Sequence, residues 1–118
     1  MSASKETIEQ LQIAATAASD KLGEELVALD VSEPFALAEI FLSASAKNER
    51  QAQAMSDNVE DELLKAGVKT RFREGRKTGR WILLDFGDLV VHIMHEQERE
   101  YYSLERLWRD CPVVPIKN

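Results

Sequence analysis

Two short apolar segments, residues 80–86 and 89–94, are separated by only Gly87 and Asp88. Both segments are dense in Ile, Leu and Val, a composition typical of central strands covered on both faces. A two-residue connection favours an antiparallel hairpin, because parallel strands need a crossover of a dozen or more residues. The sequence therefore predicts a β-hairpin at the centre of the fold.

Two amphipathic helices precede this hairpin. The first begins after Ser4, repeats apolar residues at steps of three and four, and ends at Gly23. The second begins after Asn48, with Gln51 three residues later as in a capping box, and ends at Gly67. Each helix has one apolar stripe, so both are predicted to pack on a common core.

Three further segments are predicted strands: residues 26–31, residues 36–43, and residues 68–73, where the side chains alternate between basic and uncharged as in a half-exposed strand. For residues 36–39, one helical turn is the equal alternative. After the hairpin, residues 96–100 and 103–109 are predicted helices.

An extended tail containing Pro112 and Pro115 follows. The expected order is α-β-β-α-β-β-β-α-α, an α/β (α+β) fold in which helices pack on a mixed five-stranded sheet. A chain of 118 residues fits a single domain, residues 1–118.

The charge and the single cysteine restrict the function classes. The net charge of −6 makes most of the surface a poor binder of nucleic acid. Cys111 alone can form neither an internal disulfide nor a typical thiolate metal site. No apolar run approaches the ~20 residues of a membrane span, and the first residues lack the order of a signal peptide. We expect a soluble, cytoplasmic protein.

Residues 69–80 form a basic exception, with six Lys or Arg and one Glu. A solvated strand and loop is the favoured interpretation, because Phe72 is the only aromatic residue among these charges. Local contact with one phosphate of a partner is the alternative interpretation, and an RNA-binding module is the least favoured functional hypothesis.

Carboxylates and histidines in the hairpin raise the question of a metal site. Asp85 and Asp88 could hold Mg²⁺, and a minimal Mg²⁺-dependent nucleotidyltransferase-like enzyme using both is the alternative functional hypothesis. A Gly-Asp turn nevertheless explains Asp88 without a metal. Zinc needs three or four ligands, so His92 is expected to be a hydrogen-bonded strand histidine. We predict no catalytic residue, metal or cofactor.

Aromatic and methionine side chains are frequent anchors of protein interfaces. Trp81 opens a predicted strand and Met94 closes another, so both are predicted to form an exposed contact patch at the rim of the sheet. Trp108 is expected to pack the last helix onto the sheet.

The hairpin and the segment after it resemble the signature of the ribosomal silencing factor family, RsfS/Iojap. The similarity is carried by residues 79–92, GRWILLDFGDLVVH, and by residues 99–108, REYYSLERLW. It extends from about Lys21 to Ile116. The positions that match the signature are Trp81, Asp85, Gly87, Asp88, His92, Arg99, Tyr101, Tyr102, Leu104 and Trp108.

The resemblance implies a translation repressor. Such proteins bind ribosomal protein uL14 on the large ribosomal subunit and sterically prevent the small subunit from joining when nutrients are short. Their fold is similar to that of nucleotidyltransferases, but the family is not regarded as catalytic.

Within that resemblance we infer which residues bind the partner. Trp81 and Met94 are the expected apolar anchors, joined by Asp85, His92 and Tyr102. Glu96 and Glu98 are expected to complement a basic ribosomal protein. We also expect weak homodimerisation through the sheet edge or the first helix, on the reasoning that the stripe of that helix exceeds what one core can cover.

Overall fold

The computed structural model describes residues 3–33, 37–101 and 109–117. The described elements follow the predicted order, and nearly all of the last predicted helix, 103–109, lies outside the described residues. No described helix combines the length and the apolar character that crossing a membrane requires. The elements are α1 (Lys5–Asp20), β1 (Glu24–Asp30), β2 (Ile40–Ala46), α2 (Glu49–Lys65), β3 (Phe72–Glu74), β4 (Trp81–Asp85), β5 (Leu89–His95) and α3 (Glu96–Tyr101).

The five strands form one mixed sheet in the order β1-β2-β5-β4-β3. The β2–β5 pair is parallel, and the other three pairs are antiparallel. The predicted hairpin is confirmed: β4 pairs with β5 in a register that sets Trp81 opposite Met94 and Asp85 opposite Val90. Gly87 in its turn has a φ of 100°, a conformation that L side chains rarely adopt.

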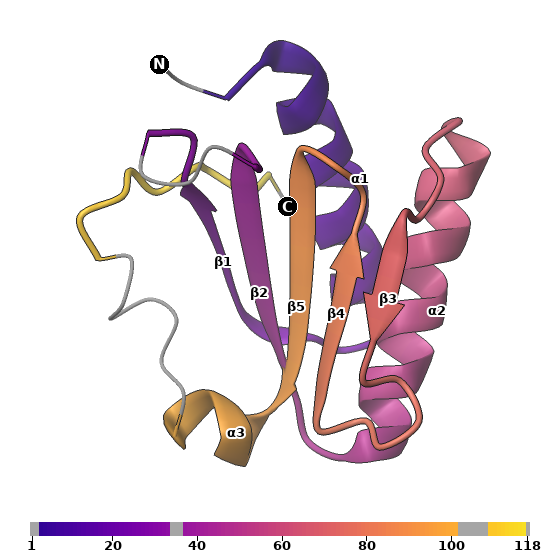
Figure 1. Ribbon diagram of the computed structural model, residues 1–118. Helices are drawn as coiled ribbons and strands as arrows, with labels where there is room; N and C mark the ends of the chain where they lie inside the picture. The colour runs from indigo at the N-terminus through magenta and orange to yellow at the C-terminus, as the bar shows by residue number, and fades with distance from the viewer. Residues whose placement is uncertain (1–2, 34–36, 102–108, 118) are drawn as a thin grey trace.

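Both long helices lie against one face of the sheet (Figure 1). Their predicted caps are confirmed, because the side chains of Ser4 and Asn48 accept hydrogen bonds from the backbone N–H groups of Thr7 and Gln51 at 3.2 and 2.8 Å. Leu11 of α1, Met55 of α2 and the alternate strand residues that face them form the main core. The sheet and helices thus make two layers, and the other sheet face is free of both long helices.

Two strands differ in position from their predictions. The predicted strand 36–43 is β2 at Ile40–Ala46, which begins where the backbone N–H of Ile40 donates to the carbonyl of Asp88. The predicted strand 68–73 is reduced to the three residues of β3. The Thr70 hydroxyl instead donates to Glu60 of α2 at 2.7 Å, which holds the preceding residues against that helix.

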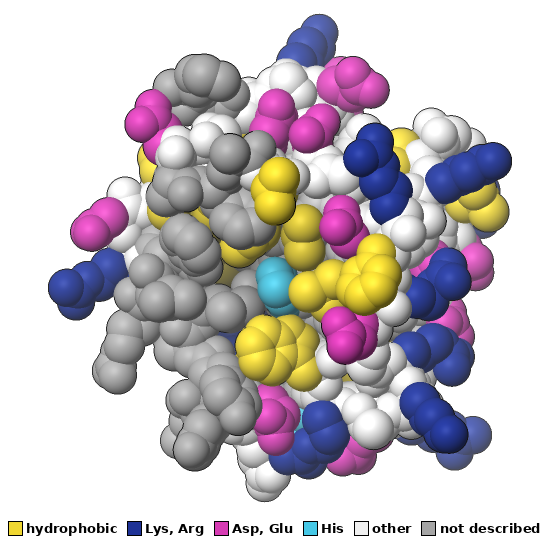
Figure 2. Space-filling model, viewed as in Figure 1, with side chains coloured by type: hydrophobic (Ala, Val, Ile, Leu, Met, Phe, Trp, Pro, Cys, Tyr) yellow, Lys and Arg dark blue, Asp and Glu magenta, His cyan; other side chains and the backbone are white. Residues whose placement is uncertain are grey.

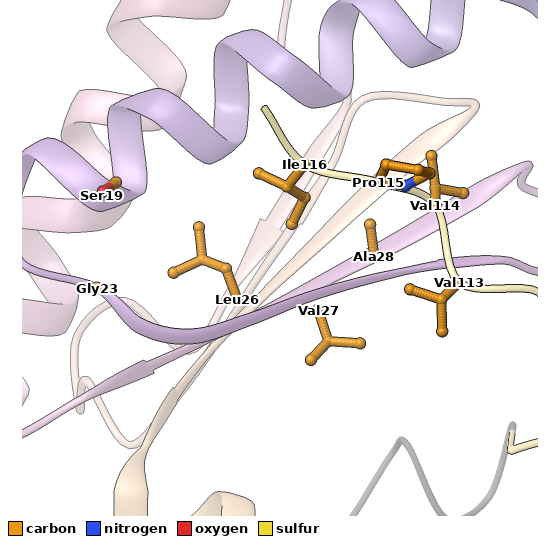
Figure 3. Close-up of a pocket in the computed structure, with 9 residues that line it drawn as sticks. All are labelled: Ser19, Gly23, Leu26, Val27, Ala28, Val113, Val114, Pro115 and Ile116. Carbon is orange, nitrogen blue, oxygen red and sulfur yellow. The ribbon is translucent and has the colours of Figure 1, made fainter. Parts of the chain in front are cut away.

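The C-terminal segment returns to the outer edge of the sheet. The Asp30 N–H donates to the Pro112 carbonyl and the Val114 N–H donates to the Ala28 carbonyl, both at 2.8 Å. Val114 and Ile116 pack against the main core, and Figure 3 shows this segment crossing beside β1. The tail predicted only as extended is therefore a structural part of the β1 edge.

Candidate interaction surface on the open face of the sheet

The sheet face opposite α1 and α2 carries a second, smaller apolar cluster. Its buried members come from β1, β2, β5 and the β1–β2 connection: Leu29, Val31, Ala38, Phe41 and Val90. Figure 2 shows apolar side chains grouped around a histidine near the middle of this face. Half-buried Cys111 packs beside the cluster, and burial, followed by the charges of Asp110 and Asp30, raises the pKa of its thiol. A raised thiol pKa does not suit a nucleophile.

The accessible part of this face lies on β4 and β3. Alternate residues of β4 point to opposite faces, so Ile82 and Leu84 are buried in the core while Trp81, Leu83 and Asp85 remain half-buried on the open face. Phe72 of β3 is paired opposite Asp85, and Glu74 opposite Leu83. We call these five residues on the open face the β3–β4 surface: Trp81, Leu83, Asp85, Phe72 and Glu74.

This surface joins three apolar side chains to two carboxylates. Phe72 is 54% exposed, an unusual exposure for an aromatic side chain on a short edge strand. Apolar anchors accompanied by acidic groups suit a partner that offers an apolar patch bordered by cations.

Trp81 is oriented by His92. The indole Nε1–H donates to His92 Nδ1 at 3.2 Å, and the two ring centroids lie 6.1 Å apart. Phe41 contacts the imidazole edge-on from the neighbouring strand, with centroids 5.2 Å apart. The prediction of a hydrogen-bonded strand histidine is confirmed. With only 6% of its surface exposed, His92 offers a partner little direct contact.

The prediction that Met94 is an exposed anchor is wrong. Met94 has an exposed fraction of 0%, and every residue of β5 is buried. The reason is strand order: β5 lies at the centre of the sheet, so Met94 stands between Ser45 of β2 and Trp81 of β4. The predicted contact residue Tyr102 lies outside the described residues.

β4 also departs from its prediction as a strand covered on both faces. Its open-face residues are only half-buried, since its outer neighbour β3 is three residues long. Leu83, Phe72 and Glu74 were not predicted as site residues. The signal for Leu83 was present in the alternation from Trp81 to Asp85, which sets these residues on one face.

The carboxylate of Asp85 and the backbone of Asp88 both have structural roles in the hairpin. Asp85 Oδ1 accepts a hydrogen bond from the Gly87 N–H at 2.8 Å, which closes the turn. The carbonyl of Asp88 accepts hydrogen bonds from the N–H groups of Glu39 and Ile40. Throughout the described ranges, no three His, Cys, Asp or Glu side chains are grouped as metal ligands. The bond to the Gly87 N–H explains Asp85 as a structural residue of the turn.

Arginines of the basic segment are largely neutralised by α2. Arg73 pairs with Glu60 at 2.6 Å and Arg76 with Asp57 at 2.7 Å. The Arg76 guanidinium holds the pKa of Asp57 below its usual value by hydrogen bonding and charge. These pairs favour the interpretation of a solvated strand and loop over a nucleic-acid surface.

Two arginines attach α3 to the rest of the fold. Arg80 bridges Glu49 of α2 at 3.1 Å and Glu98 of α3 at 2.9 Å. Arg99 donates to the Ser45 hydroxyl at 3.0 Å and is 8% exposed. Glu98 is therefore engaged by Arg80, whereas Glu96 is exposed.

A groove of about 460 Å³ lies between α1, β1 and the C-terminal segment (Figure 3). Ser19 contributes the only side-chain hydroxyl among its lining residues, and no lining side chain is charged. Nucleotide phosphates need charged or convergent polar donors, so this groove does not suit a nucleotide. The lining residues are Ser19, Gly23, Leu26, Val27, Ala28, Val113, Val114, Pro115 and Ile116.

Known proteins resemble the chain over nearly its full length. A Bacillus subtilis protein named ribosomal silencing factor RsfS is 39% identical over 106 residues, covering 90% of each chain. The crystal structure of a Chromobacterium violaceum protein superposes with a TM-score of 0.84 at 36% identity, covering 86% of this chain and 84% of that one. The maize chloroplastic protein Iojap is 33% identical over 86% of this chain and 44% of its own length.

The fold agrees with these similarities, since the mixed five-stranded sheet and its helices superpose on the solved relative over 86% of this chain. Residues 4–118 match the family described as "Ribosomal silencing factor during starvation", RsfS. Because that match spans almost the entire sequence, this chain belongs to the ribosomal silencing factor family.

Proposed function

We propose that this protein represses translation by binding ribosomal protein uL14 on the large ribosomal subunit and blocking the joining of the small subunit when nutrients are limiting. Membership of the silencing factor family supports a ribosome-directed regulatory role. The structural observation that carries the proposal is the β3–β4 surface, where Trp81, Leu83 and Phe72 stay accessible on the sheet face opposite the long helices.

The mechanism needs no chemical step. Two bodies that cannot occupy the same face of the large subunit exclude one another, so the degree of repression follows the affinity and concentration of the bound protein. Aromatic side chains in the centre of the contact supply most of the binding energy. Asp85 and Glu74 add charge complementarity toward a basic protein and speed the encounter.

The partner-binding set is revised accordingly. Trp81 remains the principal anchor, with Leu83 and Phe72 in place of Met94 as the further apolar contacts. Asp85 contributes charge, and Tyr102 stays a proposed contact. His92 and Met94 act from beneath the surface. We place the protein in the cytoplasm, with its ribosomal partner.

Contact with ribosomal RNA is a secondary part of the proposal. Of the six cations in residues 69–80, the three that form no ion pair within the described parts of the chain are Lys69, Arg71 and Lys77. All three are exposed, so they are the residues proposed to approach a phosphate.

Homodimerisation is proposed through the sheet edge or the first helix. Leu11, Ala15 and Ala18 of the α1 stripe are covered by the main core, whereas Leu22, just beyond the helix, is 75% exposed.

The test is co-sedimentation with purified large and small ribosomal subunits. The wild-type chain should bind large subunits selectively. Trp81→Ala should raise the dissociation constant about 30-fold or more, the range of an interface hot spot. Leu64→Ala is the matched control, because Leu64 is 57% exposed but belongs to α2, on the other side of the sheet. Equal binding by Trp81→Ala and wild type would rule out this surface.

A further inference from the structure

We infer that His92 is a positioning residue for Trp81, whose indole it holds in the orientation that the partner protein recognises. The inference rests on the proposed function, because it assigns a role to a buried residue beneath the β3–β4 surface. It differs from the sequence-based prediction, in which His92 touched the partner directly.

The geometry joins the two residues across the β4–β5 pair. His92 stands directly opposite Leu83, and Trp81 lies two residues before Leu83 on the same face. The diagonal between them is spanned by the hydrogen bond from Trp81 Nε1–H to His92 Nδ1 at 3.2 Å. Because Nδ1 accepts, the ring proton of the neutral imidazole must sit on Nε2.

His92 is itself held firmly. It is 6% exposed, its strand is buried from end to end, and Phe41 packs edge-on at 5.2 Å with an interplanar angle of 70°. The imidazole is therefore a fixed acceptor, and its bond restrains the half-buried indole of Trp81. The planes of the two rings are inclined by 54°, so the bond selects a tilted indole.

Restraint of this kind acts on affinity. A half-exposed side chain that samples several rotamers must be ordered when a partner binds, and that ordering weakens association. An indole already held in one orientation avoids the loss. Removing the acceptor should therefore weaken binding by about three- to tenfold while leaving the apolar area of Trp81 in place.

Two substitutions of His92 separate positioning from packing. His92→Leu fills the site but removes the acceptor. His92→Asn is smaller, yet its Oδ1 occupies the place of Nδ1 and can accept from the indole. Packing alone predicts that Asn is the worse replacement. Positioning predicts that Leu raises the dissociation constant about three- to tenfold and that Asn stays within about twofold of wild type.

The experiment measures large-subunit binding for both variants, alone and combined with Trp81→Phe, which lacks the indole donor. In the Trp81→Phe background, His92→Leu should have no further effect. The free protein supplies an independent readout: the indole N–H signal of Trp81, assigned by its loss in Trp81→Phe, should exchange slowly with solvent in wild type and rapidly in His92→Leu.

The outcomes distinguish the two proposals. Failure of the wild-type chain to bind large subunits overturns the proposed function and this inference together. Normal wild-type binding that is lost in Trp81→Ala but unchanged in His92→Leu overturns the inference alone. A fast-exchanging Trp81 indole in the wild-type protein also overturns it, even where His92→Leu fails to fold.

Discussion

The backbone N–H of Ala3 donates to Asp30 Oδ2 at 2.9 Å, which ties the residue before the α1 cap to the end of β1. The other oxygen of the same carboxylate accepts from the N–H and the hydroxyl of Ser32, at 3.0 and 2.6 Å. Asp30 also donates its own N–H to the Pro112 carbonyl. One residue thus joins the start of the chain, the first strand and the C-terminal segment.

This junction predicts a loss of stability in acid. Burial opposes ionisation of Asp30, but the hydrogen bonds from Ser32 and Ala3 outweigh it, and the pKa of this carboxyl lies below its usual value. A lowered folded-state pKa means stabilisation that is complete above about pH 4 and is lost as the pH falls through the folded-state value. The pKa of Glu39 is lowered as well, chiefly by the hydrogen bond from the Ser4 N–H, so the stability that Glu39 contributes is also lost in acid.

Asp30→Asn should reduce the free energy of unfolding by about 1–2 kcal/mol at pH 7 and by less at pH 3. Urea denaturation at both pH values measures the difference. Glu9→Gln, a surface change on α1, is the control and should be neutral. An equal effect of Asp30→Asn at both pH values would contradict the assignment.

Two glycines with the same backbone conformation test how closely the loop before β4 packs against Trp81. Gly67 and Gly75 both have a φ of 85°, but a Cβ at Gly67 would meet nothing within 4 Å, whereas one at Gly75 would clash with the Trp81 carbonyl oxygen. Gly67→Ala should lose only the backbone preference, about 1 kcal/mol. Gly75→Ala must also displace the first residue of β4, so it should be destabilised by at least about 1 kcal/mol more.

Urea denaturation of both variants provides the measurement, with large-subunit binding as a second readout. Gly75→Ala should also weaken binding, because the displaced residue carries the Trp81 anchor. Equal unfolding free energies for the two variants would show that the loop moves freely away from Trp81.

The side chain of Gln12 joins α1 to the C-terminal segment by two hydrogen bonds. Its side-chain Nε2 donates to the Pro115 carbonyl at 3.0 Å, and its Oε1 accepts from the Lys117 N–H at 2.9 Å. Gln12→Ala should lower the unfolding free energy by about 1 kcal/mol and speed proteolysis of the last residues. Thr16→Ala, an exposed change one turn later, is the control. Unchanged proteolysis would mean that pairing with β1 suffices to hold the segment.

Local signals account for the parts of the fold that were predicted correctly. The caps at Ser4 and Asn48 and the two-residue turn at Gly87 depend on neighbours within a few positions, so the chain displays them directly. Long-range pairing accounts for the errors. Met94 is buried because β2, more than forty residues earlier, pairs in parallel with β5, and nothing near Met94 in the sequence announces this.

The candidate site divides in the same way. Trp81 and Asp85 carry a recognisable local pattern, and their place on an open face was predictable from strand alternation. Phe72 joins them only because β3 pairs with β4 in a register set by tertiary structure. The docking of the C-terminal segment beside β1 likewise depends on contacts with α1 that are distant in sequence.

The salt dependence of ribosome binding should distinguish the cations of residues 69–80 that form ion pairs from those that do not. The double variant Lys69→Gln/Lys77→Gln removes exposed charges that form no ion pair with any described residue, so it should leave the unfolding free energy within about 0.5 kcal/mol of wild type. The double variant Arg73→Gln/Arg76→Gln leaves Glu60 and Asp57 without their cations and should be slightly less stable than wild type. If the protein binds RNA phosphates, only the lysine variant should weaken the dependence of large-subunit affinity on salt concentration. In a plot of log affinity against log salt concentration, the magnitude of the slope should fall by about one unit for each phosphate that is no longer neutralised. An unchanged slope in the lysine variant would confine the interface to protein, as the apolar character of the β3–β4 surface favours.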